Sequence, residues 1–171
     1  MLRFLIISLL TLMLTACGFH LRGVEKLSPE LNNLYIQTKN PNGQMAQTLQ
    51  RLLLANKIQL ATNKTDASSI LDIIAVNSTQ QATSLIGGGQ AVTYTITNTV
   101  TFSILNTNQK VIYGPTTVRA MQNYSSNASQ ALTSTHKAQA LNTQLQKNLA
   151  NQILQQLTNV TTTTCYNRTT T

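Results

Sequence analysis

Side chains that could act as general acids, bases, nucleophiles or metal ligands are few in this sequence and widely spaced. Its 171 residues include 4 acidic residues, 2 histidines and 2 cysteines. Neither His20 nor His136 has a carboxylate or a cysteine at the spacing of a catalytic triad or a zinc site. Gly87-Gly88-Gly89 lacks the lysine and the serine or threonine that complete a phosphate-binding loop. The sequence therefore predicts no catalytic residue and no metal site, and we expect the protein not to be an enzyme.

Cys17 is the exception, because it follows a segment with the dimensions of a signal peptide. Arg3 provides a positive start, and residues 4–14 form an almost uninterrupted apolar run. A membrane-spanning helix needs about 20 apolar residues, so this shorter run fits a signal-peptide core instead. It ends in Leu14-Thr15-Ala16-Cys17, which resembles the lipobox of bacterial lipoproteins. We therefore expect residues 1–16 to be removed, with an ordinary signal peptide and a buried cysteine as the alternative.

Lipidation of Cys17 would attach a diacylglyceryl group and an N-acyl chain, and we expect no other cofactor. Each buried methylene contributes about 0.8 kcal/mol and a single acyl chain binds only marginally, so several chains are needed for a durable anchor. Gly18 follows the cysteine. In the sorting pattern that this motif resembles, glycine here implies export to the inner leaflet of the outer membrane, with the domain in the periplasm. Cys165 would then have no intramolecular disulfide partner.

The charge of the chain is positive but thinly distributed. Lys and Arg number 12 against 4 Asp and Glu, which gives a net charge of +8, yet charged residues make up only 9% of the chain. A disordered chain combines high charge with low hydrophobicity, whereas 42% of these residues are hydrophobic. A nucleic-acid-binding domain would concentrate its basic residues, so we expect no nucleic-acid partner. The positive field favours anionic lipids as partners, with an ordinary solvated surface as the alternative.

The clearest structural signal is a period of two over residues 92–105. The even positions from 92 to 104 are apolar except for Asn98, and the odd positions from 93 to 103 are threonine or serine. This pattern predicts a long strand with one apolar face and one hydroxyl-rich face. Residues 111–124 are expected to return as its antiparallel partner, with a bulge or edge break at Gly114-Pro115. The hydroxyl-rich face is compatible with the polar lumen of a large β-barrel, and equally with an ordinary solvent-facing sheet.

The remaining elements predict one domain over residues 31–158. We expect strands over residues 34–36 and 70–76, a short extended stretch at residues 58–60, and helices over residues 44–57 and 127–157. Asn127 is expected to cap the second helix. The fold class is α+β: a two-layer sandwich of an approximately four-stranded, mostly antiparallel sheet with both helices on one face. Residues 17–30 are expected to form the anchor and tether, and residues 159–171 a disordered threonine-rich tail.

Leu85 and Ile86 stand next to the glycine triplet, at the expected tip of a hairpin. Apolar residues exposed on such a tip are candidates for contact with a partner. A flexible loop without a binding role is the alternative.

The opening of the mature chain resembles a known family. Cys17-Gly18-Phe19-His20-Leu21-Arg22-Gly23 is similar to the first signature of the lipopolysaccharide-assembly lipoprotein family, LptE. The resemblance continues through Pro41-Asn42-Gly43 with the helix behind it, the strand over residues 90–105, Ile112-Tyr113 and the helix entry at residues 127–132. It therefore covers most of the mature chain.

This resemblance implies an outer-membrane lipoprotein that plugs the large lipopolysaccharide-exporting barrel LptD. The small protein would assist barrel assembly and contact lipopolysaccharide during its delivery to the cell surface. Family members can carry basic residues at the hairpin tip and at the start of the last helix. This sequence has Gly87-Gly88-Gly89 at the first place and Ser134 at the second. Arg119 and Lys137 remain as candidates for lipopolysaccharide contact. The second hypothesis is a structural lipoprotein that binds peptidoglycan or another envelope machine.

Overall fold

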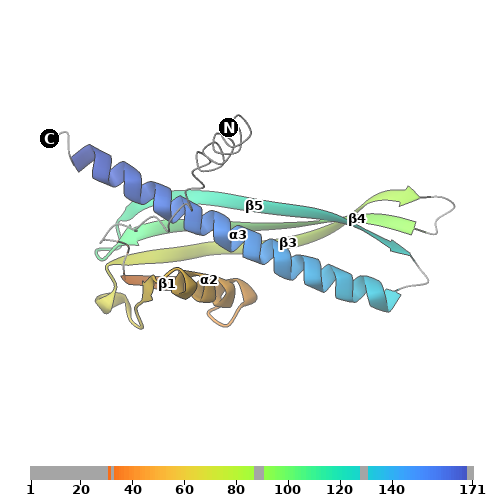
Figure 1. Ribbon diagram of the computed structural model, residues 1–171, viewed down its shortest axis with the longest axis horizontal. Coiled ribbons are helices and arrows are strands. Elements are labelled where there is room, and N and C mark those ends of the chain that lie inside the picture. Colours follow the sequence, from red (N-terminus) through yellow and green to blue (C-terminus); the bar gives the residue numbers. More distant parts are fainter. Residues whose placement is uncertain (1–30, 32, 87–90, 128–130, 169–171) are drawn as a thin grey trace, which may run out of the picture.

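The computed structural model describes residues 31, 33–86, 91–127 and 131–168 (Figure 1). The elements follow in the order β1 (Asn33–Thr38), α2 (Gln44–Ala55), β2 (Gln59–Leu60), the 3-10 helix η2 (Lys64–Asp66), β3 (Ser69–Ile86), β4 (Ala91–Asn106), β5 (Val111–Asn127) and α3 (Ala131–Arg168). The expected signal peptide, the expected lipidation site Cys17, the expected tether up to residue 30 and the glycine triplet at residues 87–89 lie outside the described residues.

One sheet joins all the described strands in the order β2-β1-β3-β4-β5. β3, β4 and β5 pair antiparallel, whereas β1 is parallel to both β2 and β3. Both helices bury side chains in the same core, so the predicted two-layer α+β sandwich is confirmed. The sheet has five strands rather than about four, because the extended stretch after α2 joins its edge as the two-residue β2.

β3 is much longer than the strand predicted over residues 70–76. It pairs with β4 from Ser69 opposite Asn106 to Ile86 opposite Ala91, with register shifts near Ile74 and Thr83. Residues 77–84 are mostly polar and lack an apolar alternation, so the sequence alone does not indicate a strand there. Pairing along the whole of β4 supplies their backbone hydrogen bonds instead.

α3 corrects two expectations from the sequence. Asn127 does not cap it, since that residue ends β5 and the helix begins at Ala131. The helix also continues to Arg168, so the prediction of a disordered tail over residues 159–171 is wrong for residues 159–168. Val160 packs against the core, and extending an established helix costs far less than nucleating one, even through threonines. None of the helices in the described part of the chain is long and apolar enough to cross a membrane.

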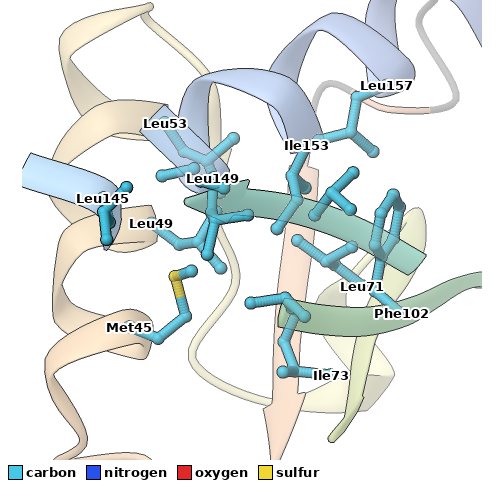
Figure 2. Close-up of a cluster of buried hydrophobic side chains, with 14 of the residues drawn as sticks. Met45, Leu49, Leu53, Leu71, Ile73, Phe102, Leu145, Leu149, Ile153 and Leu157 are labelled. Carbon is cyan, nitrogen blue, oxygen red and sulfur yellow. The ribbon is translucent and has the colours of Figure 1, made fainter. Parts of the chain in front are cut away.

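The core lies where α2 and α3 meet the sheet. Each helix buries residues three or four positions apart, which places them on one face. Figure 2 shows the side chains that converge from α2, α3 and the strands: Met45, Leu49, Leu53, Leu145, Leu149, Ile153, Leu157, Leu71, Ile73 and Phe102. Burying a side chain of this size contributes about 1.5–3 kcal/mol. The apolar face predicted for β4 is confirmed, because Ile96, Val100, Phe102 and Ile104 are all buried.

The bulge predicted at Gly114-Pro115 is also confirmed. Phe102 pairs with Thr116 and Ile104 with Tyr113, so both residues of the bulge lack a partner on β4. Gly114 has a φ of +90°, and a Cβ at this position would lie 2.8 Å from the carbonyl oxygen of Phe102. Glycine is therefore required here both by the backbone conformation and by the space available.

Candidate functional site

The two carboxylates in the described part of the chain accept hydrogen bonds from neighbouring neutral side chains. Asp72 accepts a hydrogen bond from Gln37 Nε2 at 2.9 Å, and Asp66 accepts one from the Thr65 hydroxyl at 3.3 Å. Among the described residues, no three His, Cys, Asp or Glu side chains gather where they could hold a metal ion. His136 is exposed on α3.

One face of the long sheet is built from threonine. Since the even-numbered side chains of β4 point into the core, the odd-numbered ones point to the opposite face. This surface, which we call the threonine face, consists of Thr93, Thr95, Thr97, Thr99 and Thr101 of β4 with their partners on β3 and β5. These five threonines are partly exposed. Both helices pack on the other side of the sheet, so no helix in the described part of the chain covers the threonine face.

Hydrogen bonds between neutral side chains on neighbouring strands order the threonine face. The Thr95 hydroxyl donates to Asn123 Oδ1 at 2.8 Å, and the Thr101 and Thr117 hydroxyls lie 2.8 Å apart. Cross-strand pairs of this kind contribute about 0.2–1 kcal/mol each. Arg119, which pairs with Thr99, adds a positive charge to this face. The face thus offers many neutral donors and acceptors in a fixed array.

Arg119 and Lys137, the two candidates for lipopolysaccharide contact, lie on opposite sides of the sheet. Arg119 is on the threonine face, and its carbonyl oxygen accepts a hydrogen bond from Gln152 Nε2 at 3.4 Å. Lys137 is exposed on α3, which packs on the core side. The structure therefore does not bring these two cations together into one anion site.

Leu85 and Ile86 are the last residues of β3 rather than part of a loop. They pair with Val92 and Ala91, so the hairpin stays paired up to its tip. Their side chains lie outside the described part of the structure, and their role in partner contact stays a prediction.

Buried amides between α3 and the sheet are a feature that the sequence reasoning identified only in part. Asn98, which interrupts the apolar face of β4, is 2% exposed and donates from Nδ2 to Asn142 Oδ1 at 2.5 Å. Gln146 follows one turn later on α3 and is 8% exposed. Asn98 Oδ1 and Gln146 Oε1 are buried without a hydrogen-bond partner among the described residues. The spacing of Asn142 and Gln146 by four residues was the available signal that both face the sheet.

Tyr124 forms a second polar link beneath α3. Its ring stacks on that of Tyr94, with centroids 5.5 Å apart, and its hydroxyl accepts a hydrogen bond from Gln80 Nε2 at 2.9 Å. Burial raises the pKa of the Tyr124 hydroxyl, and the neighbouring Tyr94 raises it further, while the hydrogen bond from Gln80 opposes the shift. The link joins β3 to β5 across β4.

Comparison with known proteins gives one consistent result. The LptE model, described as lipopolysaccharide-assembly, matches residues 31–157. The LPS-assembly lipoprotein LptE of Photorhabdus laumondii is 24% identical over 156 residues, which cover 91% of this chain and 85% of that protein. The protein of the same name from Yersinia pestis is 25% identical over 158 residues, covering 91% and 75%.

Solved structures share the fold. A minor lipoprotein from Acinetobacter baumannii matches with a TM-score of 0.65 and 22% identity, over 78% of this chain and 93% of its own. Lipoprotein B from Nitrosomonas europaea matches with a TM-score of 0.69 and 20% identity, over 82% and 90%. Because the family model spans nearly the whole folded domain, from before β1 into α3, this chain belongs to the lipopolysaccharide-assembly family LptE.

Proposed function

We propose that this protein is an outer-membrane lipoprotein that plugs the lumen of the LptD β-barrel, assists assembly of that barrel and takes part in lipopolysaccharide transport to the outer leaflet. The observation that carries the proposal is the family match over residues 31–157. The relatives from Photorhabdus laumondii and Yersinia pestis are named LPS-assembly lipoproteins, and each aligns with this chain over most of both lengths.

The threonine face supports a position inside a barrel. The interior of a large outer-membrane barrel is polar, and a plug must satisfy polar groups on the barrel wall after water has been displaced. Unpaired charges are costly in such a setting, whereas hydroxyls and amides can donate and accept with many partners. The ordered pairs Thr95–Asn123 and Thr101–Thr117 provide this chemistry over two neighbouring strands.

The anchor sets how far the domain can lie from the membrane. If Cys17 carries the lipid, residues 17–30 connect it to the folded domain, which begins at Leu31. An extended chain spans about 3.3–3.6 Å per residue, so this tether reaches at most roughly 50 Å. The domain would therefore stay at the periplasmic surface of the outer membrane, within reach of a barrel in the same membrane.

This role requires binding rather than covalent chemistry, and the acyl groups on Cys17 are the only non-protein groups that it needs. Contact with lipopolysaccharide phosphates is assigned to exposed cations, with Arg119 and Lys137 as separate contacts because they lie on opposite sides of the sheet. Leu85 and Ile86 would extend the contact with the barrel at the hairpin tip.

Affinity purification from detergent-solubilised outer membranes tests the proposal. A tagged, lipidated chain should recover a large β-barrel in stoichiometric amount, and depletion of the chain should reduce the lipopolysaccharide displayed at the cell surface. Recovery of the chain without such a barrel, together with normal surface display after depletion, would overturn the proposal. Recovery with peptidoglycan or with another envelope complex would support the second hypothesis instead.

A further inference from the structure

β3 has a long open edge. β1 pairs with β3 only as far as Ile73, and beyond this point the described part of the sheet has no strand on that side of β3 (Figure 1). The register shifts near Ile74 and Thr83 enclose a regular stretch over residues 75–82. This stretch is longer than an average strand of about 5–6 residues. Alternate residues along it direct backbone N–H and C=O groups away from β4.

Between its two register shifts, the open edge of β3 lacks the charged residues and proline that usually prevent pairing with another strand. Residues 74–82 contain no charged residue and no proline, although natural sheet edges are normally protected by such residues. Ile74 and Val76 are 40% and 46% exposed. The opposite edge of the sheet is guarded, because β5 carries Pro115 and Arg119, and the carbonyl oxygen of Arg119 already accepts a hydrogen bond from α3.

A hollow of about 460 Å³ lies at the start of this open edge. It is lined by β3, by the end of β1, by the first turn of α2 and by α3, through residues 38–40, 43–46, 73–77 and Gln146. Gln146 is more than nine-tenths buried, and its Oε1 atom lacks a hydrogen-bond partner in the described part of the chain. An unpaired buried acceptor costs about 1–3 kcal/mol, so a donor that enters the hollow would recover this energy.

The electrostatics of the hollow favour an acidic group. α2 begins after Gly43, which has no side chain to cap the helix, and its first turn contains no acidic residue. The N-terminus of a helix carries about half a positive charge, and Lys39 lines the same hollow. Across the described residues, Asp66 and Asp72 are the acidic side chains against nine Lys and Arg. Two copies of this chain would therefore repel each other, and an acidic partner would be attracted.

We propose that residues 74–82 of β3 bind an extended, acidic segment of a partner protein as an added strand. The backbone of the segment would pair with the open edge, in the manner of β-augmentation. A carboxylate of the segment would lie in the hollow beside Lys39 and the N-terminus of α2. A backbone N–H or a hydroxyl of the segment would donate to Gln146 Oε1. This inference goes beyond the barrel-plug function and does not depend on it.

Fluorescence anisotropy with the full mature chain tests the proposal. The probe is a labelled peptide of alternating threonine and valine with one central aspartate. Replacing that aspartate with lysine should weaken binding at least about tenfold, because the hollow is positive. N-methylation of alternate backbone nitrogens should weaken binding to a similar extent, because it removes donors needed for strand pairing. The second comparison separates strand addition from simple charge attraction.

Two matched substitutions locate the peptide on the chain. Val76→Glu, at the open edge, should weaken binding about tenfold, since a charge on an edge blocks pairing. Met121→Glu adds the same charge to β5, where Met121 is 55% exposed, and should leave binding within about twofold. Gln146→Leu should weaken binding without loss of thermal stability, because it removes an acceptor that already lacks a partner. Circular dichroism confirms that each variant is folded.

Several results would overturn the proposal. The first is that the N-methylated peptide binds as tightly as the unmodified peptide. The second is that the substitutions at residues 76 and 121 weaken binding to the same extent. The third is that the aspartate peptide does not bind at about 1 mM. Sedimentation velocity provides the remaining comparison. A dimer that forms with increasing protein concentration and disappears in Val76→Glu would assign the edge to a second copy of this chain, and the acidic partner would be rejected. None of these results depends on recovery of a barrel, so the two proposals can fail separately.

Discussion

Polar side chains beneath α3 show how single residues shape this protein. Asn98 occupies a position in β4 where the alternation calls for an apolar residue, and it forms a buried pair with Asn142. Tyr124 lies in the same layer and is held by Gln80. Each of these groups costs free energy to bury and recovers part of it through a specific hydrogen bond. The Asn98–Asn142 pair fixes how α3 is placed over the sheet, because an apolar interface could slide more easily, whereas the Gln80–Tyr124 pair joins β3 to β5.

The Asn98–Asn142 pair can be tested with a double-mutant cycle. Asn142→Leu alone should lower the free energy of unfolding by about 1–3 kcal/mol, because Asn98 is then left buried without any partner. Replacing both residues with leucine should recover most of this loss, and the coupling measured by urea denaturation should be positive. The two single effects would simply add if the pair were formed only weakly in solution.

The pKa of Tyr124 predicts how stability depends on pH. Burial raises the pKa of its hydroxyl above the ordinary value of 10.0, so the folded protein holds this proton more tightly than the unfolded chain. Stability from this group is therefore fully present below pH 10 and is lost as the pH rises through the folded-state pKa. Urea denaturation at neutral and alkaline pH should show a smaller alkaline loss for Tyr124→Phe than for the parent chain. An identical loss in both proteins would contradict the prediction.

At the scale of elements, the sequence predicts those with a strong local pattern and misses those set by pairing. The threonine alternation identifies β4, and the apolar stripe identifies α2. β3 beyond residue 76 has no such pattern, and its strand conformation depends on β4 alongside it. The sequence also does not predict on which face of the sheet Arg119 lies, because the bulge at Gly114-Pro115 reverses which positions of β5 point into the core. Sequence alone does not show how many residues a bulge removes from the register.

The threonine face predicts the effect of a charge placed on β4. Thr97→Lys should change stability by no more than about 1 kcal/mol, since the residue is partly exposed on a strand. Recovery of the barrel from solubilised membranes should nevertheless fall sharply, because the added lysine must lose water where the threonine face contacts the polar interior of the barrel. Gln50→Lys adds the same charge on the exposed surface of α2 and should leave recovery unchanged. Equal recovery with both variants would remove the threonine face from the barrel interface.

At the scale of the whole molecule, the packed end and the hairpin tip lie far apart. β1 pairs with the start of β3, whereas the tip follows its last residue (Figure 1). At about 3.3 Å per residue, the length of β3 separates the two by nearly 60 Å. If Cys17 carries the lipid, the packed end is the end of the domain that follows the anchor in the sequence, because Leu31 lies just before β1. The proposed contact of the hairpin with a barrel is therefore compatible with an anchor that stays in the membrane.

The proposed membrane anchor depends on lipidation of Cys17. Cys17→Ala should abolish incorporation of labelled palmitate, because the acyl groups have no other expected attachment site. Cys165→Ala is the matched control and should incorporate the label normally, since that residue has no part in the lipobox. Each buried methylene of an acyl chain contributes about 0.8 kcal/mol to membrane binding, and Cys17→Ala lacks these chains. When Cys17→Ala is produced in excess of the barrel, the molecules that are not bound to a barrel should therefore fractionate with soluble periplasmic proteins. If Cys17→Ala still incorporated palmitate, or if its unbound molecules stayed in the membrane fraction after an alkaline wash, the anchor would lie elsewhere in the chain.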